Sequence, residues 1–131
     1  MCGINGIYNH SKVTIGDEES LVKEMNYHIR HRGPDDSGTW KNESAGIFFG
    51  HQRLSIIDLS SSGHQPMVSE KGNVIIFNGE IYNYKEIKEH VKDRKFKSDS
   101  DTEVLLLLYE KYGYDCLKLL NGMFADRKSV V

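Results

Sequence analysis

The segment MCGINGIY, residues 1–8, alternates small and β-branched residues almost from the start of the chain. Such alternation is typical of a β-strand with one buried face. We therefore expect residues 2–8 to form an N-terminal strand that begins at Cys2. Because methionine before a small residue is usually removed, Cys2 would then carry a free α-amine.

The following stretches contain one helical and several strand-like patterns. Acidic residues at 18 and 19, followed by apolar residues at 21, 22, 25 and 29, predict a helix that ends near Arg30, before Gly33-Pro34. Apolar runs separated by glycines predict two or three short strands between residues 37 and 59. Residues 60–66 have the composition of a loop.

The pair Asn78-Gly79 follows an apolar stretch, residues 74–77, that predicts a strand. The next periodic stretch, residues 84–91, has helical spacing. The pair Asn78-Gly79 therefore follows a predicted strand but does not connect it to a second strand in an obvious hairpin.

The last helical pattern begins at Ser100, which stands three residues before Glu103. This capping-box spacing predicts that the two residues reciprocally satisfy backbone amides, at the start of a helix that Gly113 stops. A short helix is expected over residues 115–120.

Length and composition restrict the class of protein. The chain has 131 residues, 38% apolar and 27% charged, which suits one globular domain or a piece of one. It contains no apolar run of the roughly 20 residues that a spanning helix needs and no secretion signal, so the cytoplasm is the expected compartment. The 17 basic and 19 acidic residues nearly balance, which predicts neither nucleic-acid nor membrane binding.

Cys2 would combine a nucleophile and a base on one residue. An α-amine titrates at about pH 8, so part of it is neutral at pH 7 and can accept the thiol proton. The position alone is a weak signal, since a cysteine there is usually incidental. Cys2 and Cys116 have neither disulfide nor metal-ligand spacing, and no metal site is expected.

Six motifs together give a much stronger signal. They occur in the order MCGINGIY, HRGPDDSG, GHQRLSIIDLS, GHQP, FNGEIYN and SDSDTEVLL. With them, residues 2–125 resemble the class II glutamine amidotransferases, and among these the asparagine synthetases. The resemblance implies an α+β fold of the N-terminal-nucleophile hydrolase type, an αββα four-layer sandwich of two antiparallel sheets, incomplete here. It also implies hydrolysis of glutamine to glutamate and ammonia through a Cys2 thioester.

The resemblance assigns Cys2, Asn78 and Gly79 to catalysis. Cys2 would attack the side-chain amide carbon, while the Asn78 NH2 group and the Gly79 N–H would stabilise the oxyanion. A plain turn is the competing interpretation of Asn78-Gly79. Residues 30–35, which include the HRGPD loop, are expected to be structural or positioning elements near Cys2.

The resemblance also assigns the glutamine-binding residues. Arg53 would hold the α-carboxylate with its planar fork, and Glu80 and Asp101 would lie near the α-ammonium. Backbone groups around Leu54 and Ile56 would complete the site. For Asp101 the competing interpretation is an acid that stabilises the first turn of a helix.

The resemblance implies L-glutamine as substrate and a C-terminal synthetase domain as partner, with no cofactor in this chain. ATP and Mg²⁺ would belong to the missing synthetase domain, and the full-length enzyme could be a homodimer. Two alternatives remain open. One is a glutaminase domain that supplies ammonia to another acceptor, and the other is a binding module that keeps the fold without catalysis.

The chain departs from the family after Ala125. The hexapeptide DRKSVV, residues 126–131, has no family counterpart, and GAT CGG AAG AGC GTC GTG, the start of a common sequencing adapter, encodes it. We therefore expect a partial amidotransferase domain over residues 2–125, an adapter-derived tail, and a true reading frame that continues. Because strands that cover the sheets would be missing, the isolated chain is expected to be unstable, aggregation-prone and inactive.

Overall fold

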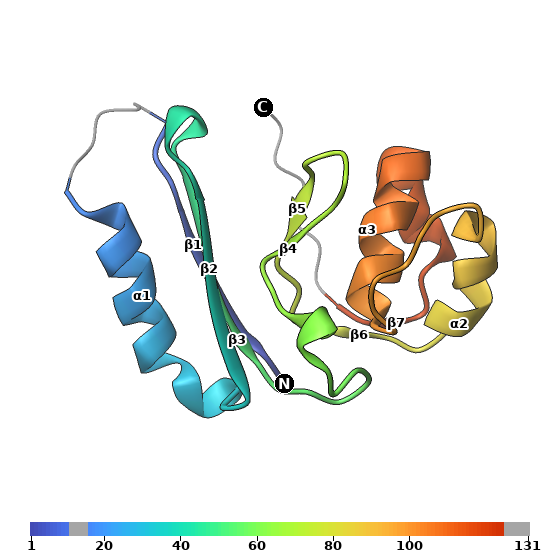
Figure 1. The fold of residues 1–131 in the computed structure, drawn as a ribbon, viewed down its shortest axis with the longest axis horizontal. Coiled ribbons are helices and arrows are strands. Elements are labelled where there is room, and N and C mark those ends of the chain that lie inside the picture. The colour runs from blue at the N-terminus through green and yellow to red at the C-terminus, as the bar shows by residue number, and fades with distance from the viewer. Residues whose placement is uncertain (11–15, 125–131) are drawn as a thin grey trace.

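The computed structural model describes residues 1–10 and 16–124 of the chain, so the predicted tail at residues 126–131 lies outside the described part. Along the longest axis, helix α1 (Glu18–His28) comes first, followed by a three-stranded sheet, short strands, and the helices α3 (Asp101–Tyr112) and α2 (Tyr84–Ile87) (Figure 1). All strand pairs within the described residues are antiparallel. The fold is therefore α+β with antiparallel sheets, as expected.

The three-stranded sheet contains the N-terminal strand. In sheet order its members are β1 (Gly3–Tyr8), β3 (Ile47–Arg53) and β2 (Asp36–Asn42). The predicted N-terminal strand is thus confirmed, and the region from 37 to 59 contributes two strands. Gly3 lies opposite Gln52, and Asp36 lies opposite Arg53. This register places Cys2 beside the end of β3.

Helix α1 covers one face of this sheet (Figure 1). The Asp17 side chain caps it by accepting the N–H of Ser20 at 3.1 Å, and the helix ends at His28, close to the predicted end. Its buried residues are Glu18, Val22 and Asn26. Leu21, which the periodicity places on the apolar face, is 50% exposed, because α1 packs on the sheet with the side that carries Glu18, Val22 and Asn26.

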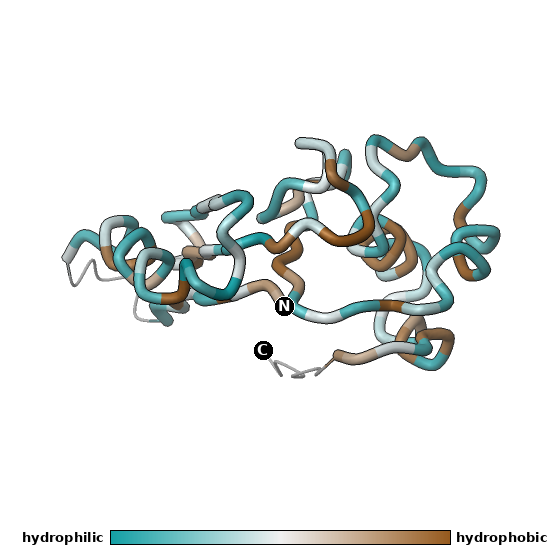
Figure 2. Tube along the Cα trace, turned by 90° about the horizontal axis from the view of Figure 1, so that it is seen from below, coloured by the Kyte–Doolittle hydropathy of each residue, from teal (hydrophilic) through white to brown (hydrophobic). Residues whose placement is uncertain are grey.

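The second half of the chain forms a compact apolar cluster. Its elements, in chain order, are β6 (Glu80–Ile81), α2, a 3-10 turn (Lys88–Val91), α3, a 3-10 helix (Gly113–Leu119) and β7 (Gly122–Met123), which pairs with β6. The expected helix over 84–91 is therefore half α-helix and half 3-10 turn, and the one expected over 115–120 lies in a 3-10 helix. Apolar residues are concentrated in α3 and its neighbours, whereas α1 is mostly hydrophilic (Figure 2).

Between the two halves lie β4 (Met67–Val68) and β5 (Val74–Ile75), which pair with each other. The predicted strand over 74–77 is thus limited to its first two residues, because residues 76–79 turn towards β6. Two 3-10 turns, Glu43–Ala45 and Ser61–Gly63, complete the connections, and a third (Arg30–Arg32) follows α1. Within the described residues, no helix is both long and apolar enough to cross a membrane.

The start of α3 corrects one prediction. Ser100 Oγ accepts the N–H of Glu103 at 3.2 Å, as a capping box requires. The Glu103 carboxylate does not return to the Ser100 N–H, however, and instead accepts the N–H groups of Lys97 and Ser98 at 2.9 and 2.7 Å. Ser98 Oγ takes the Ser100 N–H at 3.3 Å. Only one of the two hydrogen bonds of the capping box is therefore formed, and the Glu103 carboxylate binds the preceding loop to the helix instead.

Candidate active site

A small cavity of about 60 Å³ lies where the end of β3, residues 77–80 and the start of α3 meet. Seven of the eight predicted site residues line it: Cys2, Arg53, Leu54, Ile56, Gly79, Glu80 and Asp101. The structure therefore brings together residues that are up to 99 positions apart in the sequence, from Cys2 to Asp101. Asn78, the eighth, is adjacent in the chain but does not line the cavity.

Cys2 is half-buried, directly before β1. Its Sγ accepts the N–H of Leu54 at 3.3 Å, and it lies 3.6 Å from the Leu54 carbonyl oxygen, to which the thiol can donate. Met1 also lines the cavity. While Met1 is present, the nitrogen of Cys2 is an amide and cannot act as a base.

The HRGPD loop supports the strand end that holds Cys2. Gly33 packs so closely on the backbone of Gln52 and Arg53 that a Cβ would lie 2.5 Å from it. The Asp35 N–H donates to the Arg53 carbonyl at 3.1 Å, and its carboxylate accepts the N–H of Ser55 at 2.8 Å. The loop thus brackets Leu54, the backbone partner of Cys2.

Arg53 is a buried cation at the cavity wall. Its guanidinium donates to the Ser60 carbonyl at 2.8 Å and to the Asp58 carbonyl, and Gly63 lies against it where a Cβ would not fit. The side chain therefore also holds the loop after β3. Because a guanidinium has five N–H groups, two such bonds leave donors for a ligand.

Two carboxylates, Glu80 and Asp101, also line the cavity. The Asp101 carboxylate accepts the N–H of Ile81 at 2.9 Å. Burial, together with the negative charge of Glu80, raises the pKa of Asp101 above its usual value. In the part of the chain that the structure describes, neither carboxylate forms an ion pair, so a cationic group in the cavity would relieve this repulsion.

The Asn78-Gly79 pair does not join a hairpin, because the strands on either side of it, β5 and β6, pair with β4 and β7 and not with each other. Crowding explains the glycine: a Cβ would lie 2.5 Å from the Met123 carbonyl oxygen and 2.7 Å from the Phe77 ring. The Asn78 Oδ1 atom is buried and has no hydrogen-bond partner within the described residues.

The sequence interpretation missed Gln65 and Thr102, which also line the cavity. Gln65 Nε2 donates to Thr102 Oγ1 at 3.2 Å, joining the GHQP motif, residues 63–66, to α3. The GHQP motif was the available signal, but the residue type alone does not reveal its partners. Among the described residues, no cluster of His, Cys, Asp and Glu could hold a metal ion.

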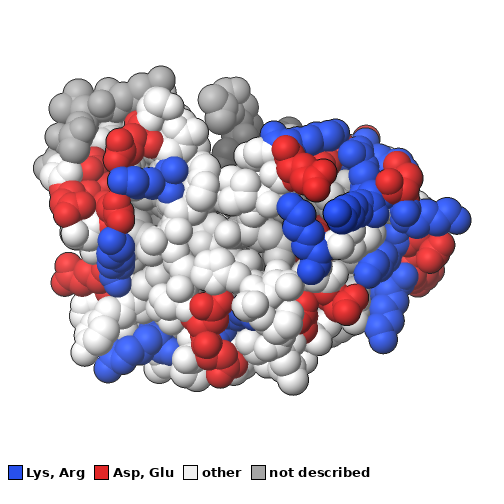
Figure 3. Space-filling model, viewed as in Figure 1, with Lys and Arg blue, Asp and Glu red and all other residues white. Residues whose placement is uncertain are grey.

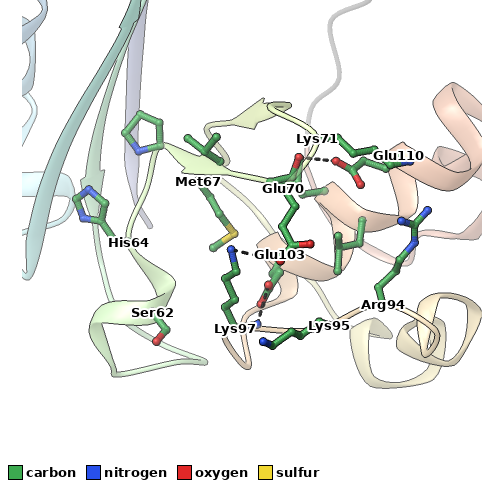
Figure 4. Close-up of a pocket in the computed structure, with 15 residues that line it drawn as sticks. Ser62, His64, Met67, Glu70, Lys71, Arg94, Lys95, Lys97, Glu103 and Glu110 are labelled. Atoms are coloured by element: carbon green, nitrogen blue, oxygen red, sulfur yellow. Dashed lines mark hydrogen bonds and ion pairs between the residues drawn. The ribbon is translucent and has the colours of Figure 1, made fainter.

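A larger cavity, about 420 Å³, lies between β4 and α3 (Figure 4). Three of its charged groups have partners in its wall or beside it. Lys97 Nζ is 3.8 Å from Glu70, and Glu110 accepts hydrogen bonds from Ser69 and Asn73. The cavity includes no predicted site residue and no cysteine, so the smaller cavity is the candidate active site.

Comparison with known proteins identifies the family of the chain. A family model described as a glutamine amidotransferase domain matches residues 1–126. The putative asparagine synthetase [glutamine-hydrolyzing] 2 of Methanocaldococcus jannaschii is 44% identical over 144 residues, which cover 95% of this chain and 27% of the relative. Asparagine synthetase [glutamine-hydrolyzing] 1 of Bacillus subtilis is 46% identical over 128 residues, which cover 95% of this chain and 20% of the relative.

A third relative, amidase chry2 of Gibberella zeae, is 41% identical over 135 residues, covering 95% of this chain and 20% of the relative. The chain thus spans about a fifth to a quarter of the length of these relatives. The family model, by contrast, extends over nearly all of the chain. The chain therefore belongs to the glutamine amidotransferase domain family.

Proposed function

We propose that this chain hydrolyses glutamine at Cys2, as the amidotransferase part of an enzyme of the asparagine synthetase type. The cavity in which Cys2, Arg53 and Asp101 meet carries the proposal, since it joins a thiol to a buried cation and a buried carboxylate. A free amino acid needs both charges, because its α-carboxylate and α-ammonium have opposite signs.

In the proposed reaction the α-amine of Cys2, released by removal of Met1, accepts the thiol proton. Sγ then attacks the side-chain amide carbon of glutamine. The Asn78 NH2 group and the Gly79 N–H stabilise the charge that develops on the amide oxygen. Ammonia leaves with the proton held by the amine, and water cleaves the γ-glutamyl thioester to glutamate.

The same proposal orients the substrate. Arg53 binds the α-carboxylate with the donors that the loop carbonyls leave unused, while Glu80 and Asp101 face the α-ammonium. Backbone groups near Leu54 and Ile56 close the site. The raised pKa of Asp101 supports this arrangement, because a bound ammonium would stabilise the charged carboxylate.

We further propose that the layers seen in Figure 1 are part of an αββα sandwich of the N-terminal-nucleophile type. The order helix, sheet, short strands and helices supports this architecture, with β4–β5 and β6–β7 as pieces of the second sheet. In the whole enzyme, ammonia would pass to a synthetase domain that uses ATP and Mg²⁺ to activate aspartate. The names of two relatives support asparagine as the product.

A second candidate function is the same glutamine hydrolysis with a different ammonia acceptor. This candidate is supported by the 41% identical relative, which is named an amidase and not an asparagine synthetase. The cavity described here binds glutamine in both cases, so it does not distinguish them. Assaying the complete gene product with aspartate and ATP does, since asparagine forms only in the first case.

The test of the proposed function is Cys2→Ala in the complete gene product. We expect loss of glutamine-dependent activity, while activity with free ammonia remains. Cys116→Ala is the matched control, because it removes the other thiol from the apolar cluster, away from the cavity. Glutamate release by Cys2→Ala at the wild-type rate, or by protein that retains Met1, contradicts the proposal.

A further inference from the structure

Two buried side chains from different elements hold Phe77, the residue directly before Asn78-Gly79. Gln65 Oε1 accepts the Phe77 N–H at 2.7 Å. On the other side, His51 Nε2 lies 3.2 Å from the Phe77 carbonyl oxygen. Gln65 is 5% exposed and His51 is fully buried at 0%. Both peptide groups of Phe77 are therefore fixed by side chains rather than by a neighbouring strand.

The direction of the histidine bond follows from its partner. A carbonyl oxygen only accepts, so His51 Nε2 carries the proton and donates it. Burial lowers the pKa of His51, which keeps the ring neutral in this tautomer. Its Nδ1 atom is buried without a hydrogen-bond partner within the described residues. The hydrogen bond from Nε2 to the Phe77 carbonyl is thus the polar contact that orients the imidazole ring.

Gln65 extends the contact to α3. Its Nε2 donates to Thr102 Oγ1 at 3.2 Å, and Thr102 follows Asp101 in the first turn of the helix. Gly38 of β2 packs against the Gln65 backbone so closely that no Cβ would fit. One glutamine therefore joins the sheet, the segment that carries Asn78 and the start of α3.

We propose that Gln65 and His51 are positioning residues that set the place of the Asn78 and Gly79 donors relative to Cys2. This inference rests on the proposed glutamine hydrolysis. The donors follow Phe77 in the chain, so their orientation depends on the peptide groups that Gln65 and His51 hold. An oxyanion donor acts mainly in the transition state, so its displacement lowers kcat more than it changes KM.

The test compares glutamine kinetics of Gln65→Met and His51→Leu in the complete gene product. We expect each to lower kcat by about 10- to 100-fold, since a displacement of about 1 Å can cost that much, with KM within about 3-fold. Asn78→Ala, which removes a donor, gives the reference pattern. His51→Gln should recover most of the loss, because the glutamine amide can donate from nearly the position of Nε2.

Asn26→Leu is the matched control for Gln65→Met. It also removes a buried amide, 3% exposed, but between α1 and the sheet rather than at the cavity. We expect reduced stability with unchanged kcat of the folded fraction. Equal loss of kcat in this control, wild-type kcat in Gln65→Met, or a loss in His51→Gln as large as in His51→Leu, overturns the inference.

Amide hydrogen exchange separates this inference from the proposed function. Gln65→Met should accelerate exchange at residues 77–79 by at least about 10-fold, with little change in β1. A wild-type protein without Cys2-dependent turnover refutes the proposed function and with it the catalytic role of the two residues. Unchanged exchange at residues 77–79 refutes the positioning itself, whatever the activity.

Discussion

The interface between α1 and its sheet differs in kind from the cluster around α3. In the first region, Asn5 Nδ2 donates to Asn26 Oδ1 at 2.6 Å, and Asn26 Nδ2 donates to the Gly38 carbonyl at 3.0 Å. In the second, an apolar cluster packs together, Ile81, Ile87, Val91, Val104, Leu107, Leu108 and Cys116, while buried polar residues are confined to the loop and first turn at the start of α3, residues 98–103. Hydrogen bonds specify the first region, and apolar burial stabilises the second.

The difference matters because the candidate active site lies where the regions meet. Cys2 and Arg53 lie at one end of the sheet, whereas Glu80 and Asp101 lie in β6 and α3, which carry residues of the apolar cluster. Figure 3 shows charged side chains gathered over the two ends of one face, with most of its middle uncharged. Hydrogen bonds between side chains and backbone hold α1 on the sheet, and the closely packed apolar cluster supports the elements that carry Glu80 and Asp101.

The largest expected effect comes from the apolar cluster. Leu108 is 0% exposed, so Leu108→Ala removes buried surface and leaves a cavity. We expect a loss of about 2–5 kcal/mol in the free energy of unfolding. Hydrogen exchange of the α3 amides in the complete gene product measures it. A loss below about 1 kcal/mol would mean that this region does not dominate stability.

The polar interface should respond less. Asn26→Leu leaves buried polar groups of Asn5 and Gly38 without their partner, which costs about 1–3 kcal/mol. Leu21→Ala on the same helix is the control, and we expect it to cost less than about 1 kcal/mol because Leu21 is half exposed. Exchange rates of the α1 and β3 amides report both. If Leu21→Ala lowers the free energy of unfolding more than Asn26→Leu does, hydrogen bonds do not dominate the interface between α1 and the sheet.

The smallest effect is a pH dependence at the contact between the regions. Burial lowers the pKa of His51, so below about pH 6.5 the unfolded chain binds a proton that the folded chain excludes. Stability from this group is therefore present above that pH and lost as pH falls, by at most about 1.4 kcal/mol per pH unit. The raised pKa of Asp101 has the opposite sign, since its contribution is lost as pH rises through the acidic range above about pH 3.8.

Urea midpoints of the wild type and His51→Gln between about pH 5.5 and 7.5 measure the histidine effect. The variant lacks the titrating ring, so its midpoint should fall less on acidification. Identical pH profiles would show that His51 does not remain neutral on folding. Asp101 contributes little to this comparison, because it is common to both proteins.

Motifs predicted most of the cavity but not its internal support. Arg53, Glu80 and Asp101 were assigned from short motifs, and the structure brings them to one cavity with Cys2. Their individual roles, and the tail at residues 126–131, remain predictions. The role of Gln65 was not predicted, since its partners, Phe77 and Thr102, are 12 and 37 positions away. A pattern of residue types carries no information about such distant pairs.

The sequence by itself determined the N-terminal strand, α1, α3 and the apolar residues of the second half, because these depend on local periodicity and caps. Only the tertiary structure decided that Leu21 faces solvent, that Glu103 holds the loop before α3, and that Arg53 also binds the loop after β3. Each depends on a partner from another part of the chain. Hydrogen bonds act over about 3 Å, so they exist only after packing has placed both groups.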